Sequence, residues 1–170
     1  LSGEKCRQHE RHNGCGDDLK QAWHFGLSYR DMVTSDQFRQ VMGNFATGIT
    51  VVTTYGPGAR PYGLTVNSFT SVSLEPLLVL VCLDNRLSGL QYFKDLKRFG
   101  VSVLSESQED LSRLFAKKDS ERPASIYYEG TTGVPLLRNC IGTLECETSA
   151  IYAGGDHQIF LDHVQALSVD

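Results

Sequence analysis

A polar run at residues 63–73 carries the side chains best suited to bind a ligand. Its sequence is GLTVNSFTSVS, and an apolar stretch follows it. Hydroxyl groups and backbone N–H groups at the mouth of a barrel can bind an anion such as a phosphate without any lysine or arginine. Composition alone favours a plainer interpretation, a Ser/Thr-rich edge strand followed by a turn.

A second group of potential ligands stands near the start of the sequence. Cys6, His9, His12 and Cys15 follow one another at regular intervals, and thiolate and imidazole are the donors that tetrahedral zinc prefers. Structural zinc sites usually separate two ligand pairs by about a dozen residues, so that two elements enclose the ion. We therefore predict no metal site and interpret residues 1–30 as a polar N-terminal extension to a domain at 31–170.

The familiar motifs of several enzyme classes are missing. The sequence contains neither G-x-x-x-x-G-K-[ST] nor a G-x-G-x-x-G after a strand-like segment, which argues against a P-loop and a dinucleotide-binding Rossmann unit. It also lacks the G-x-S-x-G elbow of many serine hydrolases. Glu145 and Glu147 alternate along a strand-like segment, and we interpret them as one solvated face.

Length and charge narrow the protein classes further. The 170 residues suit one domain with a short appendage. The longest apolar run, Leu77–Leu83, is far shorter than the roughly 18 residues of a membrane span, and no apolar signal-peptide segment opens the sequence. The short apolar runs therefore predict no membrane partner, and the net charge of −4 without a basic cluster predicts no nucleic-acid partner. Five cysteines, an odd number, indicate reduced thiols and a cytoplasmic location.

Hydrophobic patterning predicts many short strands and few helices. Helical spacing follows the capping boxes Thr34-x-x-Gln37 and Ser105-x-x-Gln108 and recurs at 87–96. Strand-like segments lie at 49–54, 62–67, 76–83, 99–104, 140–150 and 157–169, the last two joined by a glycine turn. The 76–83 segment is apolar throughout after its proline, which predicts burial on both faces, and 117–133 is predicted to be a loop. This succession of short strands with few helices favours an antiparallel barrel.

Three segments, in order, resemble motifs of the flavin reductase-like family. They are residues 43–54 (GNFATGITVVTT), 65–76 (TVNSFTSVSLEP) and 154–157 (GGDH), within a match that covers roughly residues 35–165. The resemblance implies the FMN-binding split barrel, a mainly β, antiparallel Greek-key fold with a few short helices that forms homodimers. It also implies the family's activity, the transfer of hydride from NADH or NADPH to FMN or FAD, which then serves a partner monooxygenase.

The resemblance also assigns site residues position by position. Those expected against the flavin ring edge and its ribityl phosphate are Pro61, Tyr62, Gly63, Leu64, Thr65, Asn67 and Ser68. Three further groups are expected at the site. Cys82, Leu83 and Asp84 should contact the flavin next, Ser88 and Gly89 should close near its phosphate, and Leu114 and Phe115 should line the pocket. His157 is similar to the residue that faces the nicotinamide, although a glycine-flanked turn also suits a surface histidine.

The chemistry of such a hydride transfer belongs to the two cofactors, so the protein has to orient them. Stacked rings with the donor carbon about 3–3.5 Å from the flavin N5 make the transfer effectively unimolecular. We expect backbone N–H groups near Cys82–Asp84 or Gly63–Thr65 to face the pyrimidine edge of the flavin, where negative charge grows on reduction.

Departures from the family pattern leave other functions open. Asp162 stands where the family commonly has glycine, and the sequence ends at Asp170, where relatives continue into a further strand that helps hold the nicotinamide nucleotide. The alternatives are an electron-transfer flavoprotein that holds FMN and a non-catalytic flavin-binding domain of a larger protein.

Overall fold

A computed structural model describes residues 33–118 and 120–169. The chain divides into two compact units, Leu1–Ala46 and Thr47–Asp170. The cluster of Cys6, His9, His12 and Cys15 lies outside the described residues, and its interpretation remains a prediction. No helix in the two described ranges is long and apolar enough to span a membrane.

In the first unit, helix α2 (Ser35–Met42) begins at the predicted capping box. The Gln37 N–H donates to Thr34 Oγ1 at 3.2 Å, and the Thr34 N–H donates to Gln37 Oε1 at 2.9 Å. The two bonds satisfy backbone donors that a helix start otherwise leaves unpaired. This confirms the helix predicted from residue spacing after Thr34.

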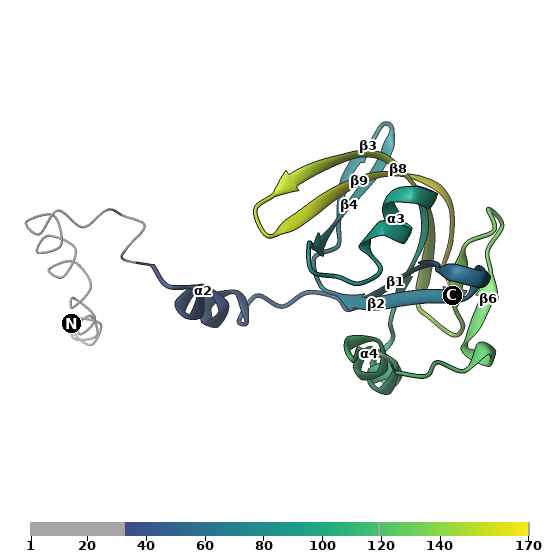
Figure 1. Ribbon diagram of the computed structural model, residues 1–170, viewed down its shortest axis with the longest axis horizontal. Coiled ribbons are helices and arrows are strands. Elements are labelled where there is room, and N and C mark those ends of the chain that lie inside the picture. Colours follow the sequence, from purple (N-terminus) through teal and green to yellow (C-terminus); the bar gives the residue numbers. More distant parts are fainter. Residues whose placement is uncertain (1–32, 119, 170) are drawn as a thin grey trace, which may run out of the picture. The chain divides into compact units, whose positions relative to one another are not determined.

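The second unit is built on one antiparallel sheet of seven strands, in the order β2-β1-β5-β8-β9-β4-β3. The strands are β1 (Thr50–Tyr55), β2 (Pro61–Val66), β3 (Thr70–Leu74), β4 (Leu77–Asp84), β5 (Arg98–Val103), β8 (Gly142–Gly154) and β9 (His157–Val169). Figure 1 shows this sheet curling around its own interior. The mainly β, antiparallel barrel predicted from the sequence is confirmed.

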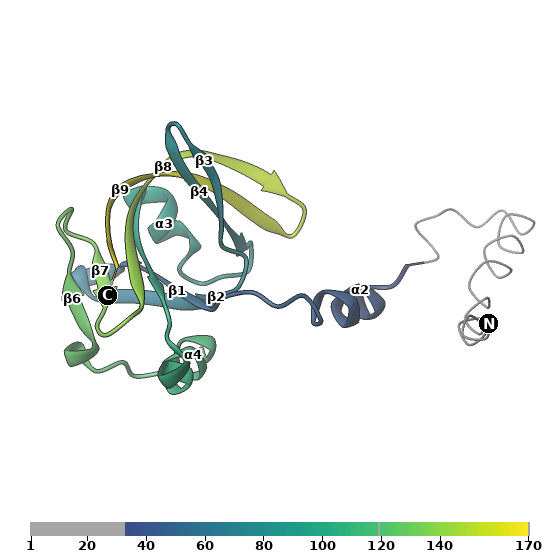
Figure 2. The ribbon, with the colours of Figure 1, turned by 180° about the vertical axis from the view of Figure 1, so that it is seen from behind.

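Short helices and a small hairpin complete the unit. The helices are α3 (Leu90–Leu96), α4 (Glu109–Ala116) and the 3-10 turns η2 (Pro57–Ala59), η3 (Glu106–Gln108) and η4 (Ala124–Ile126). A two-stranded sheet of β6 (Tyr127–Glu129) and β7 (Pro135–Leu137) lies beside β1 (Figure 2). The loop predicted at 117–133 is therefore wrong in part, because η4 and β6 lie within it and β6 takes its hydrogen bonds from a strand further along the chain.

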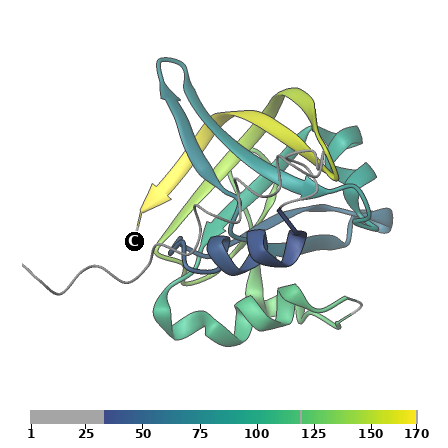
Figure 3. The same ribbon diagram turned by 90° about the vertical axis from the view of Figure 1, so that its left-hand side faces the viewer.

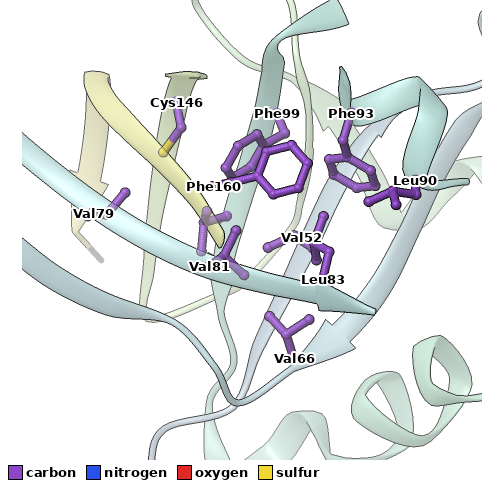
Figure 4. Close-up of a cluster of buried hydrophobic side chains, with 11 residues drawn as sticks. Val52, Val66, Val79, Val81, Leu83, Leu90, Phe93, Phe99, Cys146 and Phe160 are labelled. Carbon is purple, nitrogen blue, oxygen red and sulfur yellow. The ribbon is translucent and has the colours of Figure 1, made fainter. Parts of the chain in front are cut away.

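A cluster of buried side chains fills the barrel (Figure 4). Strands contribute Val52, Val81, Phe99 and Phe160, and α3 contributes Phe93. The Phe93 ring packs edge to face against Phe99 and Phe160, with centroids 5.8 and 6.5 Å apart. Burial of this aromatic group holds α3 against the inside of the sheet.

A second apolar cluster lies on the other face of β1. Val51 packs there with Phe115 of α4, Tyr127 of β6 and Leu137 of β7. Because successive side chains of a strand point to opposite faces, Val51 and its neighbour Val52 enter different clusters. The strand is thus buried on both faces and fixes the position of α4 relative to the barrel.

The predicted burial of residues 76–83 on both faces is wrong. In β4 the side chains of Val79, Val81 and Leu83 are buried, whereas those between them are only half-buried and Leu77 is exposed. An antiparallel strand at this place in the sheet has one face on the core and the other turned outward. Leu77 also stands at the tip of the β3–β4 hairpin, which projects from the barrel (Figure 3).

The interpretation of Glu145 as part of a solvated face is also wrong, although Glu147 is exposed. Leu144 and Cys146, the neighbours of Glu145 in β8, pack with the barrel core, so Glu145 lies on the opposite face of the strand, where it is only 5% exposed. Its carboxylate accepts hydrogen bonds from the Thr131 N–H at 2.8 Å and from the Thr132 N–H and hydroxyl, both at 2.6 Å. Burial raises the pKa of Glu145, but these bonds outweigh it and the pKa is lowered.

Candidate functional site

Tyr62 of β2 packs against the turn that precedes α3. A Cβ added to Gly89 would lie 2.3 Å from the Tyr62 ring, so only a glycine at this position admits the ring. Tyr62 Oη lies 3.5 Å from Ser88 Oγ, and the ring meets Tyr92 edge to face at 5.5 Å. Three of the expected site residues therefore lie together.

Gly63 and Thr65 bring β2 close to α4. A Cβ at Gly63 would lie 3.0 Å from the Phe115 ring, so a glycine lets this ring approach the strand. The Thr65 hydroxyl donates to the Ser112 carbonyl oxygen at 2.6 Å. Phe115 is buried and its neighbour Leu114 is half-buried. The structure thus joins the β2 and α4 members of the expected site.

The Ser68 hydroxyl ties the β2–β3 connection to β4. It donates to the Cys82 carbonyl oxygen at 2.9 Å and accepts from the Cys82 N–H at 3.2 Å. The Ser68 hydroxyl proton is therefore already used in a hydrogen bond within the protein, whereas the preceding residue, Asn67, is exposed. Burial raises the pKa of the Cys82 thiol.

His157 lies at the start of β9, opposite Asp84 at the end of β4. Its Nδ1 is 2.8 Å from Asp156 Oδ1, and its side chain is 40% exposed. Asp84 accepts from Arg86 Nη2 at 2.7 Å and from the Arg86 backbone N–H at 2.7 Å. The side-chain and backbone bonds from Arg86 hold the pKa of Asp84 far below its usual range.

Asn85 fixes the turn that carries His157, a role that the sequence did not indicate. Its backbone N–H donates to the Asp156 carbonyl at 2.9 Å and its Nδ2 to the Gly155 carbonyl at 3.1 Å. Gln158 Nε2 in turn donates to Asn85 Oδ1 at 2.8 Å. The partners lie about 70 positions away along the chain, so no local pattern could show the contact.

The remaining expected residues have other surroundings. Leu83 is 1% exposed within the barrel core, and Leu64 packs against the same cluster. Pro61 is exposed at the start of β2. The side chains of Leu64 and Leu83 serve the core, and only the backbone of these residues is left for a ligand.

Arg122, which the sequence analysis did not single out, lies against two expected site residues. Its Cζ is 4.7 Å from the centroid of the Phe115 ring and 6.0 Å from that of Tyr62. Its Nε is buried and has no hydrogen-bond partner within the part of the chain that the structure describes. Because the flanking residues are charged and resemble a loop, nothing in the local sequence distinguishes this arginine.

Two cavities lie away from these residues. One of about 160 Å³ is lined by Tyr128, Leu137, Asn139, Cys140, Thr143 and Ser168, and one of about 280 Å³ by Arg98, Thr132, Cys146, Glu147 and Gln165. Within the part of the chain that the structure describes, no group of cysteine, histidine and acidic side chains is placed to hold a metal ion. The described cysteines, Cys82, Cys140 and Cys146, are free thiols.

Comparisons with known proteins show the family to which the chain is similar. Residues 42–170 match the model of the flavin reductase like domain. A probable flavin reductase of Rhizobium meliloti is 40% identical over 129 residues, which are 75% of this chain and 42% of that protein. A flavin-dependent monooxygenase reductase subunit of Mycobacterium tuberculosis is 36% identical over 132 residues, 77% of this chain and 70% of that protein. The chain thus spans less than half the length of the first of these relatives.

A solved structure has the same fold. It is the NADH:FAD oxidoreductase of Streptomyces globisporus in complex with NAD and FAD fragments, with a TM-score of 0.74 and 39% sequence identity. The similarity covers 84% of this chain and 85% of that one. With the family model matching most of the sequence, the chain belongs to the flavin reductase-like domain family.

Proposed function

We propose that this chain transfers hydride from NADH or NADPH to FMN or FAD and supplies the reduced flavin to a partner monooxygenase. One observation carries the proposal: the end of β4 joins the two halves of the site. Cys82 is hydrogen-bonded to Ser68, which we assign to the flavin, and Asp84 lies opposite His157, which we assign to the nicotinamide, in the register of β4 and β9. The NADH:FAD oxidoreductase with the same fold supports this assignment.

The side chains around the proposed flavin site suit a phosphorylated ligand. Ser88 offers an exposed hydroxyl and Asn67 an exposed amide, and Arg122 adds a guanidinium with an unpaired buried Nε. The nearby carboxylate of Asp84 is already held by Arg86. A set of donors beside a carboxylate that Arg86 already neutralises fits the phosphate and the polar ring edge of a flavin nucleotide.

The backbone of β2 is the better candidate for contacting the pyrimidine edge of the flavin. β2 is one of the two edge strands of the seven-stranded sheet, so its alternate N–H groups point away from β1 and are open to a ligand. In β4, by contrast, the Cys82 N–H already donates to Ser68. Of the two segments expected from the sequence, Gly63–Thr65 is therefore favoured.

When bound, the flavin and the nicotinamide supply the redox chemistry. The chain supplies the orientation: Gly63 and Gly89 admit the Phe115 and Tyr62 rings against β2 and the α3 turn. Asp156 holds the His157 ring through Nδ1, which leaves Nε2 for the nicotinamide side.

We also propose a homodimer as the working form. The β3–β4 hairpin presents Val72, Leu74 and Leu77 with exposures of 47%, 82% and 46%, and projecting apolar side chains are typical of a surface that another chain covers. Sedimentation equilibrium of the wild type should give twice the chain mass. The Leu74→Lys variant should shift the equilibrium toward the monomer, and an unchanged dimer would place the interface elsewhere.

The partner and the compartment follow from the same assignment. The relative from Mycobacterium tuberculosis is a reductase subunit of a flavin-dependent monooxygenase, which supports an oxygenase as the acceptor of reduced flavin. The free thiols at Cys82, Cys140 and Cys146 support a cytoplasmic location.

Steady-state oxidation of NADH in air tests the proposed activity. A reductase should oxidise many equivalents of NADH per chain when free FMN or FAD is added and almost none without it. An electron-transfer flavoprotein would stop once its own flavin is reduced, and a non-catalytic flavin-binding domain would show no oxidation. Either result would replace the proposed function with the corresponding alternative.

A further inference from the structure

The guanidinium of Arg122 is held by aromatic rings of the proposed flavin site. Its Cζ lies 4.7 Å from the Phe115 centroid and 6.0 Å from the Tyr62 centroid, within the range of cation–π attraction. Phe115 in turn meets Tyr127 edge to face at 6.1 Å. The two rings therefore hold the guanidinium itself beside β2 and α4.

Among the described residues, this charge has no anion of its own. Across residues 33–118 and 120–169, Arg122 forms no ion pair and no hydrogen bond, and both its Nε and the nearby Tyr127 hydroxyl are buried without partners. Other arginines around the site are neutralised: Arg86 pairs with Asp84 at 2.7 Å and Arg113 with Glu109 at 2.5 Å. A buried polar group without a partner is costly, so the arrangement calls for an anionic ligand.

We propose that Arg122 binds the phosphate of the flavin nucleotide and makes the site selective for FMN and FAD over riboflavin. The inference rests on the proposed function and deepens it by naming the substrate class. A guanidinium presents two parallel N–H donors that match a phosphate. The flavin phosphate is favoured over the phosphates of the nicotinamide nucleotide because Arg122 contacts Tyr62 and Phe115, whereas His157 lies at the β4–β9 end of the site.

Binding titrations without NADH test the proposal. Quenching of flavin fluorescence is followed as FMN, FAD or riboflavin meets the full chain. The wild type should bind FMN at least about 10-fold more tightly than riboflavin. Arg122→Gln should weaken FMN binding by about 10- to 100-fold, as expected for the loss of a charge-assisted hydrogen bond, and should leave riboflavin binding unchanged.

A matched control is available at Arg138. Its Cζ lies 5.7 Å from the Tyr128 ring, away from the residues of the proposed flavin site, so Arg138→Gln removes the same charge and the same kind of aromatic contact. Its affinities for FMN and riboflavin should equal those of the wild type. Arg122→Lys, which keeps the charge but loses the fork of donors, should fall between the wild type and Arg122→Gln.

Three results would overturn the inference. In the first, Arg122→Gln binds FMN as tightly as the wild type does. In the second, its affinities for FMN and for riboflavin fall by the same factor, and in the third only its KM for NADH changes. If circular dichroism shows that the variant is unfolded, the wild type decides alone, because an FMN-to-riboflavin affinity ratio near one excludes phosphate recognition. Failure of the wild type to bind any flavin would overturn the proposed function itself.

Discussion

Asp162 on β9 is a carboxyl group enclosed by the protein, and replacing it should remove a pH dependence of stability. The residue is 0% exposed, and neither of its oxygens has a hydrogen-bond partner among residues 33–118 and 120–169. Burial raises the pKa of Asp162 from 3.8 to about 7. The buried Cys146 thiol is close by, and its pKa is raised by burial and by the charges of Asp162 and Glu145.

The direction of the pH dependence follows from which state, folded or unfolded, holds the Asp162 proton more tightly. Between the unfolded pKa of 3.8 and the folded pKa of about 7, Asp162 is ionised in the unfolded chain and protonated in the folded one. The unfolded state binds fewer protons there, so the free energy of unfolding falls as pH rises and levels off above pH 7. At about 1.4 kcal/mol per pH unit, the total loss is about 4 kcal/mol, of which about 3 kcal/mol falls between pH 5 and 8.

Urea unfolding of the wild type and Asp162→Asn at pH 5, 6, 7 and 8 measures this contribution. The amide has a similar shape and never ionises, so the variant should be more stable than the wild type by a margin that grows by about 3 kcal/mol from pH 5 to 8. Glu147→Gln, an exposed carboxylate on the neighbouring β8, should show no such growth. A margin that is constant with pH for Asp162→Asn would refute the reasoning, since the charge would then play no part.

Further predictions concern the fold and the site. Glu145→Gln should lower the free energy of unfolding at pH 7 by about 1–3 kcal/mol because an amide cannot accept all three hydrogen bonds. Since the pKa of Glu145 is lowered, the wild type should lose this stabilisation as acid protonates the carboxylate. A Glu145→Gln variant that is as stable as the wild type in urea would contradict the prediction. Gly89→Ala should cost roughly 1–3 kcal/mol because its methyl overlaps the Tyr62 ring. Gly48→Ala, whose methyl meets nothing within 4 Å, should cost no such stability. Thermal unfolding that shows equal losses of stability for the two variants would contradict the proposed contact between Gly89 and Tyr62. His157→Ala should raise the KM for NADH more than the Kd for FMN; equal effects would remove its assignment to the nicotinamide.

Local patterns predicted the elements that depend on neighbouring residues. The capping boxes at Thr34 and Gln37 and at Ser105 and Gln108 both form. The turn between β8 and β9 contains Gly155 at φ +73°, a conformation that favours glycine. The interpretation of residues 63–73 as an edge strand with a turn agrees with β2 and β3, which share this run and lie at the two edges of the sheet.

Contacts between distant segments could not be predicted in the same way. Glu145 is buried because the segment that carries Thr131 and Thr132 covers this face of β8, and no periodicity in the sequence reveals the position of that segment. β7 has three residues and begins with Pro135, so local preference assigns it to a loop. At the site, the motifs indicated Asp84 and His157 separately, but only the register of β4 and β9 makes them neighbours.

Anaerobic reduction of free flavin tests the central claim most directly. The full chain is mixed with a 100-fold molar excess of FMN and an equal excess of NADH, and flavin absorbance near 450 nm is followed. A flavin reductase should bleach all of the FMN and consume one NADH for each flavin reduced. Bleaching that stops at about one flavin per chain, or that proceeds no faster than without protein, would contradict the account.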